Sequence, residues 1–253
     1  MIERGPFLIP EWDAPGNVEA WFTTRKGGVS TGPHASLNLG LHVGDRPEAV
    51  RENRRLALLG VDRPAVWLQQ DHGTTVVELT ADSASRAAPA ADAAVTASSE
   101  VVCAVLVADC LAVLLCDRDG RRVGVAHAGW RGLCAGILES SVAAMAVAPH
   151  QIVAFLCPAI GPRAFEVGPE VHEAFVAASP ASAAAFAPVA ARPGKYLADL
   201  PALARIRLRG CGVVDIGGGA LCTASNPELF FSYRRDGVTG RMGAFIRLVP
   251  AAR

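Results

Sequence analysis

The chain has 253 residues, of which 51% are hydrophobic and 19% are charged, and its formal net charge is zero. This composition is typical of a globular protein and excludes a disordered chain. Because the charges balance and form no run of one sign, we expect a small-molecule ligand, with no nucleic acid and no membrane as partner.

The N-terminal residues lack the basic and apolar pattern of a signal peptide. The longest apolar run, 101–116, is too short to cross a membrane and contains a charged residue. The seven cysteines are scattered without the spacing of a disulfide framework. We therefore expect reduced thiols and a cytoplasmic location. No repeat or linker divides the chain, so we expect a single domain over residues 1–253.

Runs of β-branched and aromatic residues between turn residues predict the strands in chain order. They cover residues 18–24, 65–69, 75–79, 101–107, 113–116, 122–126, 152–157 and 242–249. The run 101–107 is apolar almost throughout, so we expect it to be buried on both faces.

Start and stop signals predict the helices. Asp45 is expected to cap a helix that ends near Leu59, and Asp199 to cap one that ends near Gly210. Two further helices are expected over 133–147 and 169–178. The alanine-rich stretches 81–99 and 177–191 are interpreted as loop or peripheral helix. Since helices and strands mix without strict alternation, the sequence predicts an α+β fold with a partly antiparallel sheet.

Three segments each place a possible metal ligand at the end of a predicted strand. They contribute His72, Cys110 and His127, and Asp109 interrupts the apolar run beside Cys110. Two imidazoles and a thiolate suit zinc. Three protein ligands leave the fourth coordination position open, which is the pattern of catalytic zinc sites. Copper accepts the same ligand atoms. The structural alternative is that both histidines fill the core or surface while Asp109 caps a turn.

A glycine-bearing basic segment, TTRKGGVS, offers a possible anion site. Arg25 and the amides of Gly27 and Gly28 could form a cradle, with Asn38 in the following SLNLG segment. The alternative is an ordinary basic loop after a strand.

Two later segments are also polar. FSYRRDGVTGR contains Arg234, Arg235 and Arg241, which could bind phosphate or carboxylate or form a solvated hairpin. CPAIGPRAFEVG contains Glu166, which is either a polar wall of a site or a cap.

Taken together, these segments form an ordered series of motifs: TTRKGGVS, LNLGLHVGD, ENRRLALL, LQQDHG, DAAVT, VADC, AHAGWRG, PAIGPRAFEVG and FSYRRDGVTGRM. The sequence resembles the purine nucleoside phosphorylase family formerly labelled multicopper polyphenol oxidase or laccase domain. Bacterial members of that family have also been called peptidoglycan editing factors. The resemblance covers about residues 21–248.

The resemblance implies a single αββα-type domain, with sheets flanked by helices, related in fold to a toxin deamidase. It also implies that His72, Cys110 and His127 bind zinc. The implied activity is phosphorolysis of adenosine, inosine, guanosine and methylthioadenosine, accompanied by deamination of adenosine. The sequence departs from the family pattern at Asp71, where valine is usual, and at Ala112, where proline is usual. Both changes could alter the surroundings of the ligands.

Catalytic roles follow as hypotheses. Phosphate is expected at Arg25 with Gly27 and Gly28, and secondly at Arg131; Asn38, Glu166 and Arg235 are further candidates for substrate binding. Asp109 is expected as the acid or base, or else as the residue that orients His127 or His72.

Three other functions remain open at this point. The first is a metal-free amidase acting on a cell-wall precursor, with Cys110 as nucleophile and His127 as base. The second is a copper polyphenol oxidase, for which the six histidines and dispersed cysteines supply too few ligands. The third is a non-enzymatic module with structural zinc. The sequence does not indicate an oligomeric state.

Overall fold

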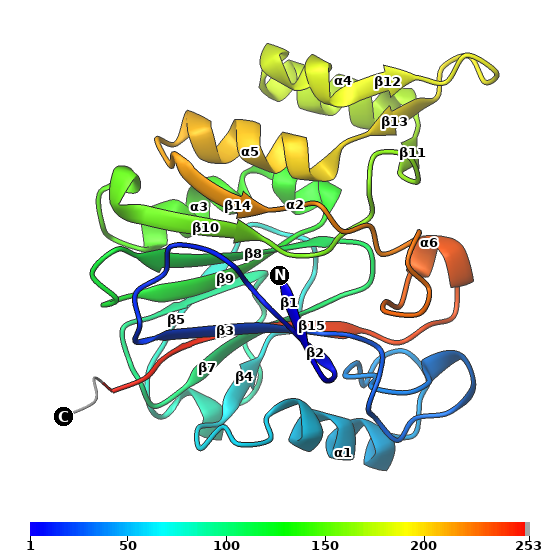
Figure 1. Cartoon of the computed structure of the whole chain (residues 1–253). Coiled ribbons are helices and arrows are strands. Elements are labelled where there is room, and N and C mark those ends of the chain that lie inside the picture. Colours follow the sequence, from blue (N-terminus) through cyan, green and yellow to red (C-terminus); the bar gives the residue numbers. More distant parts are fainter. Residues whose placement is uncertain (251–253) are drawn as a thin grey trace.

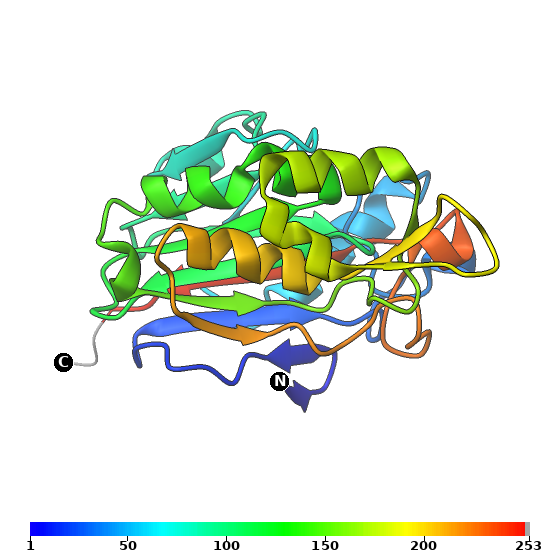
Figure 2. The ribbon, with the colours of Figure 1, turned by 90° about the horizontal axis from the view of Figure 1, so that it is seen from above.

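A computed structural model of the chain describes residues 1–250, which form four layers in the order helix, sheet, sheet, helix (Figure 1). Helix α1 (Pro47–Ala57) covers the outer face of the first sheet. Helices α2 (Trp130–Ala135), α3 (Ile137–Ala144) and α5 (Leu200–Gly210) cover the outer face of the second sheet (Figure 2). Helix α4 (Pro169–Ala178) lies beyond them, beside a small third sheet. The predicted α+β class, with helices flanking paired sheets, is confirmed.

The two main sheets hold six strands each. The first has the order β1 (Ile2–Arg4), β2 (Phe7–Ile9), β3 (Val18–Thr23), β15 (Met242–Leu248), β7 (Val102–Val107), β4 (Ala65–Trp67). The second has the order β14 (Asp215–Gly218), β10 (Ile152–Leu156), β8 (Leu111–Asp117), β9 (Val123–Ala128), β6 (Ala93–Thr96), β5 (Val76–Leu79). The third has the order β11 (Glu166–Val167), β13 (Tyr196–Ala198), β12 (Phe186–Pro188). Parallel and antiparallel pairs both occur, as expected.

The central strands are apolar on both faces because both faces meet other layers. Successive residues of a strand point to opposite sides. In β8, Leu114 packs between the two sheets, whereas Val113 packs toward α3 and α5. In β7, Val105 joins the same core between the sheets, whereas Ala104 packs toward α1. All residues of 101–107 are buried, so the prediction for this run is confirmed.

Each of the eight predicted strands is present, with ends displaced by up to two residues. The interpretation of 81–99 as loop or helix was wrong for Ala93–Thr96, which forms β6 and is fully buried between β5 and β9. Alanine has a low strand propensity, but its small side chain suits a crowded position inside the sheet, and burial decides the outcome. The interpretation of 177–191 as loop or helix was likewise wrong for Phe186–Pro188, which forms β12.

The predicted caps have different outcomes. Asp199 accepts a hydrogen bond from the backbone N–H of Ala202, so its role as the cap of α5 is confirmed. The prediction that Asp45 caps α1 was wrong, because Arg46 holds the N-cap position without a side-chain bond. The Asp45 carboxylate instead accepts hydrogen bonds from Ser30 and Asn38.

The predicted helix over 133–147 is divided into α2 and α3. Gly136 lies between them at φ 108°, a left-handed conformation that favours glycine and ends the first helix. The single-helix prediction was therefore wrong at this glycine.

The two ends of the chain share one sheet, since β3 pairs with β15. We infer from this that the chain forms one domain. No helix within residues 1–250 is long and apolar enough to cross a membrane. The seven cysteines are free.

Candidate active site

Three side chains with metal-binding atoms converge where the two main sheets are connected. His72 lies between β4 and β5, Cys110 between β7 and β8, and His127 in β9. One ligand atom from each lies within 4.8 Å of the other two. Sγ of Cys110 is 3.9 Å from Nε2 of His72, and the two imidazole rings have centroids 4.7 Å apart. The structure thus brings together the three residues that the sequence indicates as ligands, here called the triad.

The local backbone aims these side chains at one another. Strand β8 pairs antiparallel with β9 so that Ala112 lies opposite His127, which brings Cys110, two residues earlier in the chain, close to that histidine. His72 has φ 65° and Asp109 has φ 84°, both in the left-handed region. Such a conformation costs a non-glycine residue on the order of 1 kcal/mol or more, and residues of this kind cluster at functional sites.

Two glycines that follow His127 in the chain leave space for the triad. A Cβ atom at Gly129 would lie 2.8 Å from Cδ2 of His72 and 3.1 Å from Sγ of Cys110. A Cβ atom at Gly132 would lie 2.8 Å from the carbonyl oxygen of Gly73. Any larger residue at either position would displace the His72 loop, which explains the small residues around His127 in the sequence.

Asp92, the residue directly before β6, supports the triad through hydrogen bonds. Its Oδ1 lies 2.7 Å from Nδ1 of His127 and accepts a bond from the N–H of His72. Its Oδ2 accepts bonds from the N–H groups of Asp71 and Gly73. Burial alone would raise the pKa of Asp92, but the bonds from His127 and from the amides hold it well below its usual range. The carboxylate is therefore ionised and makes Nδ1 the donor, so Nε2 of His127 is left to bind a ligand.

The thiol of Cys110 differs electrostatically from the thiols of the core. Burial alone would raise its pKa, but the imidazoles of His127 and His72 outweigh burial and lower the pKa to about 6. In contrast, burial raises the pKa of Cys103 and Cys116 to about 12. A thiolate is the form of cysteine that binds metals or acts as a nucleophile.

The donor set of the triad fits a tetrahedral metal ion. Bonds of about 2.3 Å to sulfur and about 2.0 Å to nitrogen place ligand atoms about 3.3–3.6 Å apart. The 3.9 Å between Sγ of Cys110 and Nε2 of His72 is close to this spacing. Within residues 1–250 no fourth histidine, cysteine or carboxylate joins the triad. A bound ion would therefore keep one position for water or substrate.

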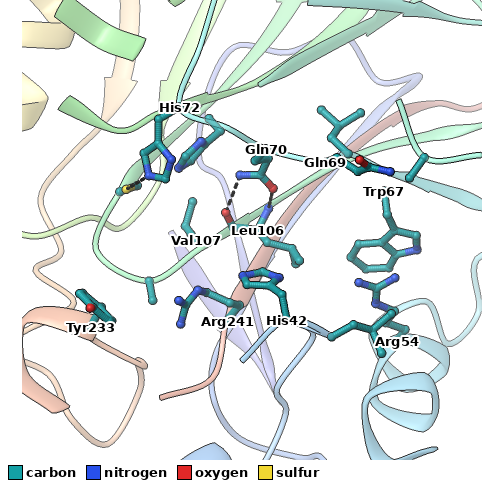
Figure 3. Close-up of a pocket in the computed structure, with 16 residues that line it drawn as sticks. His42, Arg54, Trp67, Gln69, Gln70, His72, Leu106, Val107, Tyr233 and Arg241 are labelled. Atoms are coloured by element: carbon teal, nitrogen blue, oxygen red, sulfur yellow. Dashed lines mark hydrogen bonds between the residues drawn. The ribbon is translucent and has the colours of Figure 1, made fainter. Parts of the chain in front are cut away.

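The triad opens onto a cavity of about 780 Å³ (Figure 3). This volume is in the usual range for small-molecule sites. The cavity is lined by Leu41, His42, Arg54, Trp67, Leu68, Gln69, Gln70, His72, Ala88, Leu106, Val107, Ala108, Cys110, His127, Tyr233 and Arg241. Gln70 fixes one wall, because its side-chain amide exchanges two hydrogen bonds with the backbone of Leu106.

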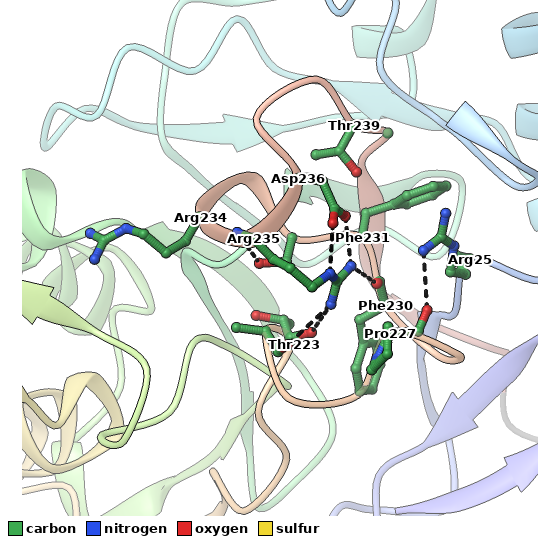
Figure 4. Close-up of polar contacts among 12 residues, drawn as sticks. Arg25, Thr223, Pro227, Phe230, Phe231, Arg234, Arg235, Asp236 and Thr239 are labelled. Atoms are coloured by element: carbon green, nitrogen blue, oxygen red, sulfur yellow. Dashed lines mark hydrogen bonds and ion pairs between the residues drawn. The ribbon is translucent and has the colours of Figure 1, made fainter. Parts of the chain in front are cut away.

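Two arginines expected to bind substrate do not line this cavity. The guanidinium of Arg25 donates to the carbonyls of Ala35 and Pro227 and lies over the ring of Phe231 (Figure 4). Arg235 donates to the carboxylate of its neighbour Asp236. It also donates to the backbone carbonyls of Thr223, Ala224 and Phe230. Both guanidinium groups therefore bond to the chain itself, and their role in substrate binding stays a prediction.

The segment with Gly27, Gly28 and Asn38 also lies outside the lining of the cavity. The N–H of Gly28 donates to the hydroxyl of Ser36 rather than facing a ligand. Asn38 is fully buried, and its Oδ1 accepts a bond from the backbone N–H of Arg241. Asn38 thus supports a residue that does line the cavity.

Asp109 lies next to Cys110 in the chain, but its carboxylate turns elsewhere. Its oxygens accept hydrogen bonds from the hydroxyls of Thr223 and Ser232 and from the N–H of Arg234. The expectation that Asp109 orients His127 was wrong, because that partner is Asp92. The acid–base role of Asp109 stays a prediction.

The two remaining candidates lie outside the cavity lining as well. The guanidinium of Arg131, at the start of α2, lies 4.4 Å from the ring centroid of Trp130. Glu166 forms an ion pair with Arg192 near the third sheet. Their roles in catalysis and substrate binding stay predictions.

Sequence reasoning missed Asp92, His42 and Arg54 as parts of the site. All three lie inside motifs of the ordered series, namely DAAVT, LNLGLHVGD and ENRRLALL. A single carboxylate that opens an apolar, alanine-rich run is a signal that could have identified Asp92. No local pattern distinguishes Arg54 from its exposed neighbour Arg55.

Comparison with known proteins adds independent findings. A family model described as multi-copper polyphenol oxidoreductase laccase matches residues 19–249. The chain is 51% identical to "Purine nucleoside phosphorylase YfiH" of Escherichia coli strain K12, over 96% of this chain and 98% of that protein. It is 50% identical to "Purine nucleoside phosphorylase PA4543" of Pseudomonas aeruginosa, with the same coverage.

Solved structures show the same similarity. The crystal structure of Neisseria meningitidis protein NMB0706 matches with a TM-score of 0.93 at 50% identity, covering 97% of this chain and all of that one. The structure of YlmD from Geobacillus stearothermophilus matches with a TM-score of 0.84 at 32% identity, covering 98% of this chain and all of that one.

Proposed function

The chain belongs to the family described as multi-copper polyphenol oxidoreductase laccase, and we propose that it acts as a zinc-dependent purine nucleoside phosphorylase. The observation that carries this proposal is the triad, which would leave a bound ion one position for substrate and which lines a cavity of about 780 Å³. The names of relatives that share about half of its residues support the same activity. The substrates we propose are adenosine, inosine, guanosine and methylthioadenosine, with accompanying deamination of adenosine.

Zinc is the metal that we propose, and copper is the second candidate. Two imidazoles and a thiolate, with ligand atoms within 4.8 Å of one another, suit zinc. Multicopper oxidase chemistry would need several metal centres, whereas residues 1–250 contain one cluster of this kind. A bound zinc ion would polarise an atom of the substrate or lower the pKa of a water molecule to about 7.

The residues of the chain supply the geometry for the reaction. Asp92 fixes the ring of His127, and the backbone of the His72 loop is tied to the same carboxylate. In phosphorolysis an oxygen of phosphate forms a bond to the anomeric carbon. The bond from that carbon to the purine nitrogen breaks, and the base leaves with the electron pair and takes up a proton. The cavity must therefore hold nucleoside and phosphate side by side.

A second function is supported by one observation. Asp92, His127 and Cys110 lie in the order expected for a cysteine hydrolase, with an ionised carboxylate behind the imidazole and a thiol of lowered pKa in front of it. This arrangement would suit a metal-free amidase acting on a cell-wall precursor. In either case we propose a cytoplasmic enzyme, which agrees with its free thiols.

The test of the proposed function is product analysis with the purified, zinc-loaded protein. Adenosine is incubated with and without inorganic phosphate, and the products are separated. We expect adenine and ribose 1-phosphate only when phosphate is present, and inosine under both conditions. If no nucleoside is consumed under either condition, the proposal is wrong and the amidase becomes the leading candidate.

A further inference from the structure

The cavity beside the triad has a second polar region, formed by His42, Arg54 and Arg241. These residues come from the segment before α1, from α1 itself and from the position directly before β15. Figure 3 shows His42 between the two arginines, with Arg54 against Trp67. All three line the same cavity as the triad. Here this region is called the arginine pocket.

Arg54 is held rigidly but keeps free donors. Its Nε donates to the carbonyl of Leu39, and its guanidinium lies 3.9 Å from the ring centroid of Trp67. This stack fixes the plane of the guanidinium and covers the face of the indole. Among residues 1–250, no acceptor bonds to the two terminal nitrogens of Arg54. The forked edge of the group is therefore free to bind a ligand.

Arg241 is positioned by residues 38–40, the same segment whose Leu39 carbonyl binds Arg54. Its backbone N–H donates to Oδ1 of Asn38, and its carbonyl accepts a bond from the N–H of Leu39. The side chain packs so closely on Gly40 that a Cβ atom there would lie 2.9 Å from Cγ of Arg241. Nη1 donates to two carbonyls of its own turn, those of Thr239 and Gly240. Nε and Nη2 have no partner within the described part of the chain.

No ion pair within the described residues neutralises the positive charges of the arginine pocket. No aspartate or glutamate within 1–250 lines the cavity. The Cys110 thiolate, which lines it, and Asp109, which does not, attract Arg241 without forming an ion pair with it. Other partly buried arginines differ: Arg207 pairs with Glu139, and Arg247 pairs with Glu19. Two half-buried guanidinium groups without a counter-ion are costly unless an anion completes the site.

The titration of the pocket agrees with its geometry. Burial lowers the pKa of Arg54 to about 10 and also lowers that of Arg241. The partial burial of the His42 ring, which keeps an exposed edge, and the two guanidinium groups together lower the pKa of His42. The three side chains line one cavity, which is why the charges of both arginines act on His42.

We propose that the arginine pocket is the subsite for the phosphate co-substrate, in place of the loop that contains Arg25, Gly27 and Gly28. This inference rests on the proposed function, because it assigns one of the two substrates of that reaction. Guanidinium groups bind phosphate oxygens in pairs through their forked donors, and an uncompensated double charge suits a dianion. The triad and the arginine pocket then hold nucleoside and phosphate within one cavity.

The experiment is a calorimetric titration of the zinc-loaded protein with inorganic phosphate. Arg54→Gln and Arg241→Gln are each expected to weaken phosphate binding by about tenfold to a hundredfold, since each removes a charge-assisted pair. The matched control is Arg51→Gln, which removes an exposed charge from the same helix and should leave the affinity unchanged. In assays of turnover, the KM for phosphate should rise in both variants while the KM for nucleoside stays constant.

The result is interpreted together with zinc content and melting temperature. If Arg241→Gln does not fold, His42→Ala offers a second test, because this exposed side chain can be removed without disturbing the core. Unchanged phosphate affinity in folded, zinc-loaded Arg54→Gln and His42→Ala would overturn the assignment, even if the enzyme is a phosphorylase. Phosphate binding that depends on Arg54 without any nucleoside turnover would support the subsite and contradict the proposed function.

Discussion

Arg235 and Arg241 lie close together in the sequence, yet they belong to regions of the molecule with opposite properties. In the region around α6 (Tyr233–Asp236), Arg235 bonds to a carboxylate and to three backbone carbonyls of its own chain. In the cavity, Arg241 keeps Nε and Nη2 without a partner among residues 1–250. The first arginine stabilises a loop, whereas the second faces space that a ligand can enter. The difference shows that a polar side chain indicates a ligand site when the fold leaves some of its hydrogen-bond donors without a partner.

The same contrast separates two aspartates. Asp109 bonds to Thr223, Ser232 and Arg234, and thereby fixes the segment that begins α6. Asp92 bonds to His127 and to the loop that carries His72. Both carboxylates are buried and hydrogen-bonded, but only Asp92 bonds to residues of the triad. The following substitutions test this division between the cavity and the surrounding structure.

The largest effect is expected for Cys110→Ala. Removal of the thiolate leaves two imidazoles, so we expect zinc to be lost and phosphorolysis to fall on the order of a thousandfold, since a Lewis acid supplies several kcal/mol. The matched control is Cys103→Ala, a buried thiol of β7 that is outside the cavity. It should lower stability while zinc content stays at one ion per chain. Equal zinc content in the two variants would contradict the assignment of Cys110 as a ligand.

The second-largest effect is expected for Asp92→Asn. The amide cannot accept all four bonds that the carboxylate accepts, so the His127 ring loses its orientation. We expect zinc affinity to fall by about tenfold to a hundredfold, measured by competition with a chelator. Asp117→Asn is the control, because this buried carboxylate bonds to Arg121 and Arg122 in a turn away from the cavity. A loss of zinc affinity of the same size in Asp117→Asn would show that Asp92 acts only through stability.

A smaller effect, on stability, is expected for Arg25→Gln. Its guanidinium donates two bonds to carbonyls and covers Phe231, so we expect the free energy of unfolding to fall by about 1–3 kcal/mol in urea denaturation. The KM for phosphate should rise far less than in Arg54→Gln. A larger rise in Arg25→Gln than in Arg54→Gln would restore the glycine-bearing loop as the phosphate site.

The smallest effect concerns pH and Asp45, which supports the loop of Asn38. Burial alone would raise the pKa of Asp45, but bonds from Asn38 and Ser30 lower it below its ordinary value. The stability from this lowered pKa is present above about pH 4 and is lost as pH falls through the folded pKa. Asp45→Asn should therefore destabilise the protein at pH 6 and make no difference near pH 2. An equal difference at both values would show that the charge of Asp45 is not involved.

Local patterns predicted eight of the fifteen strands within residues 1–250, and they indicated the triad because each of its residues lies in an apolar strand or a few residues beyond one. The same patterns could not predict the arginine pocket. Arg241 is positioned by Asn38, from the opposite end of the chain, and Arg54 is distinguished from Arg55 only by the loop that it meets. Strand β6 was missed for a related reason, since its alanines become strand residues through packing between β5 and β9.

The central claim is that one cavity binds a metal ion at the triad and phosphate at the arginine pocket. A crystal structure with zinc and inorganic phosphate, measured at the zinc absorption edge, tests it most directly. We expect one anomalous peak within about 2.3 Å of the ligand atoms of His72, Cys110 and His127, and phosphate density against Arg54 and Arg241. A peak elsewhere, a fourth protein side chain on the metal, or phosphate bound only at Arg25 would contradict the account.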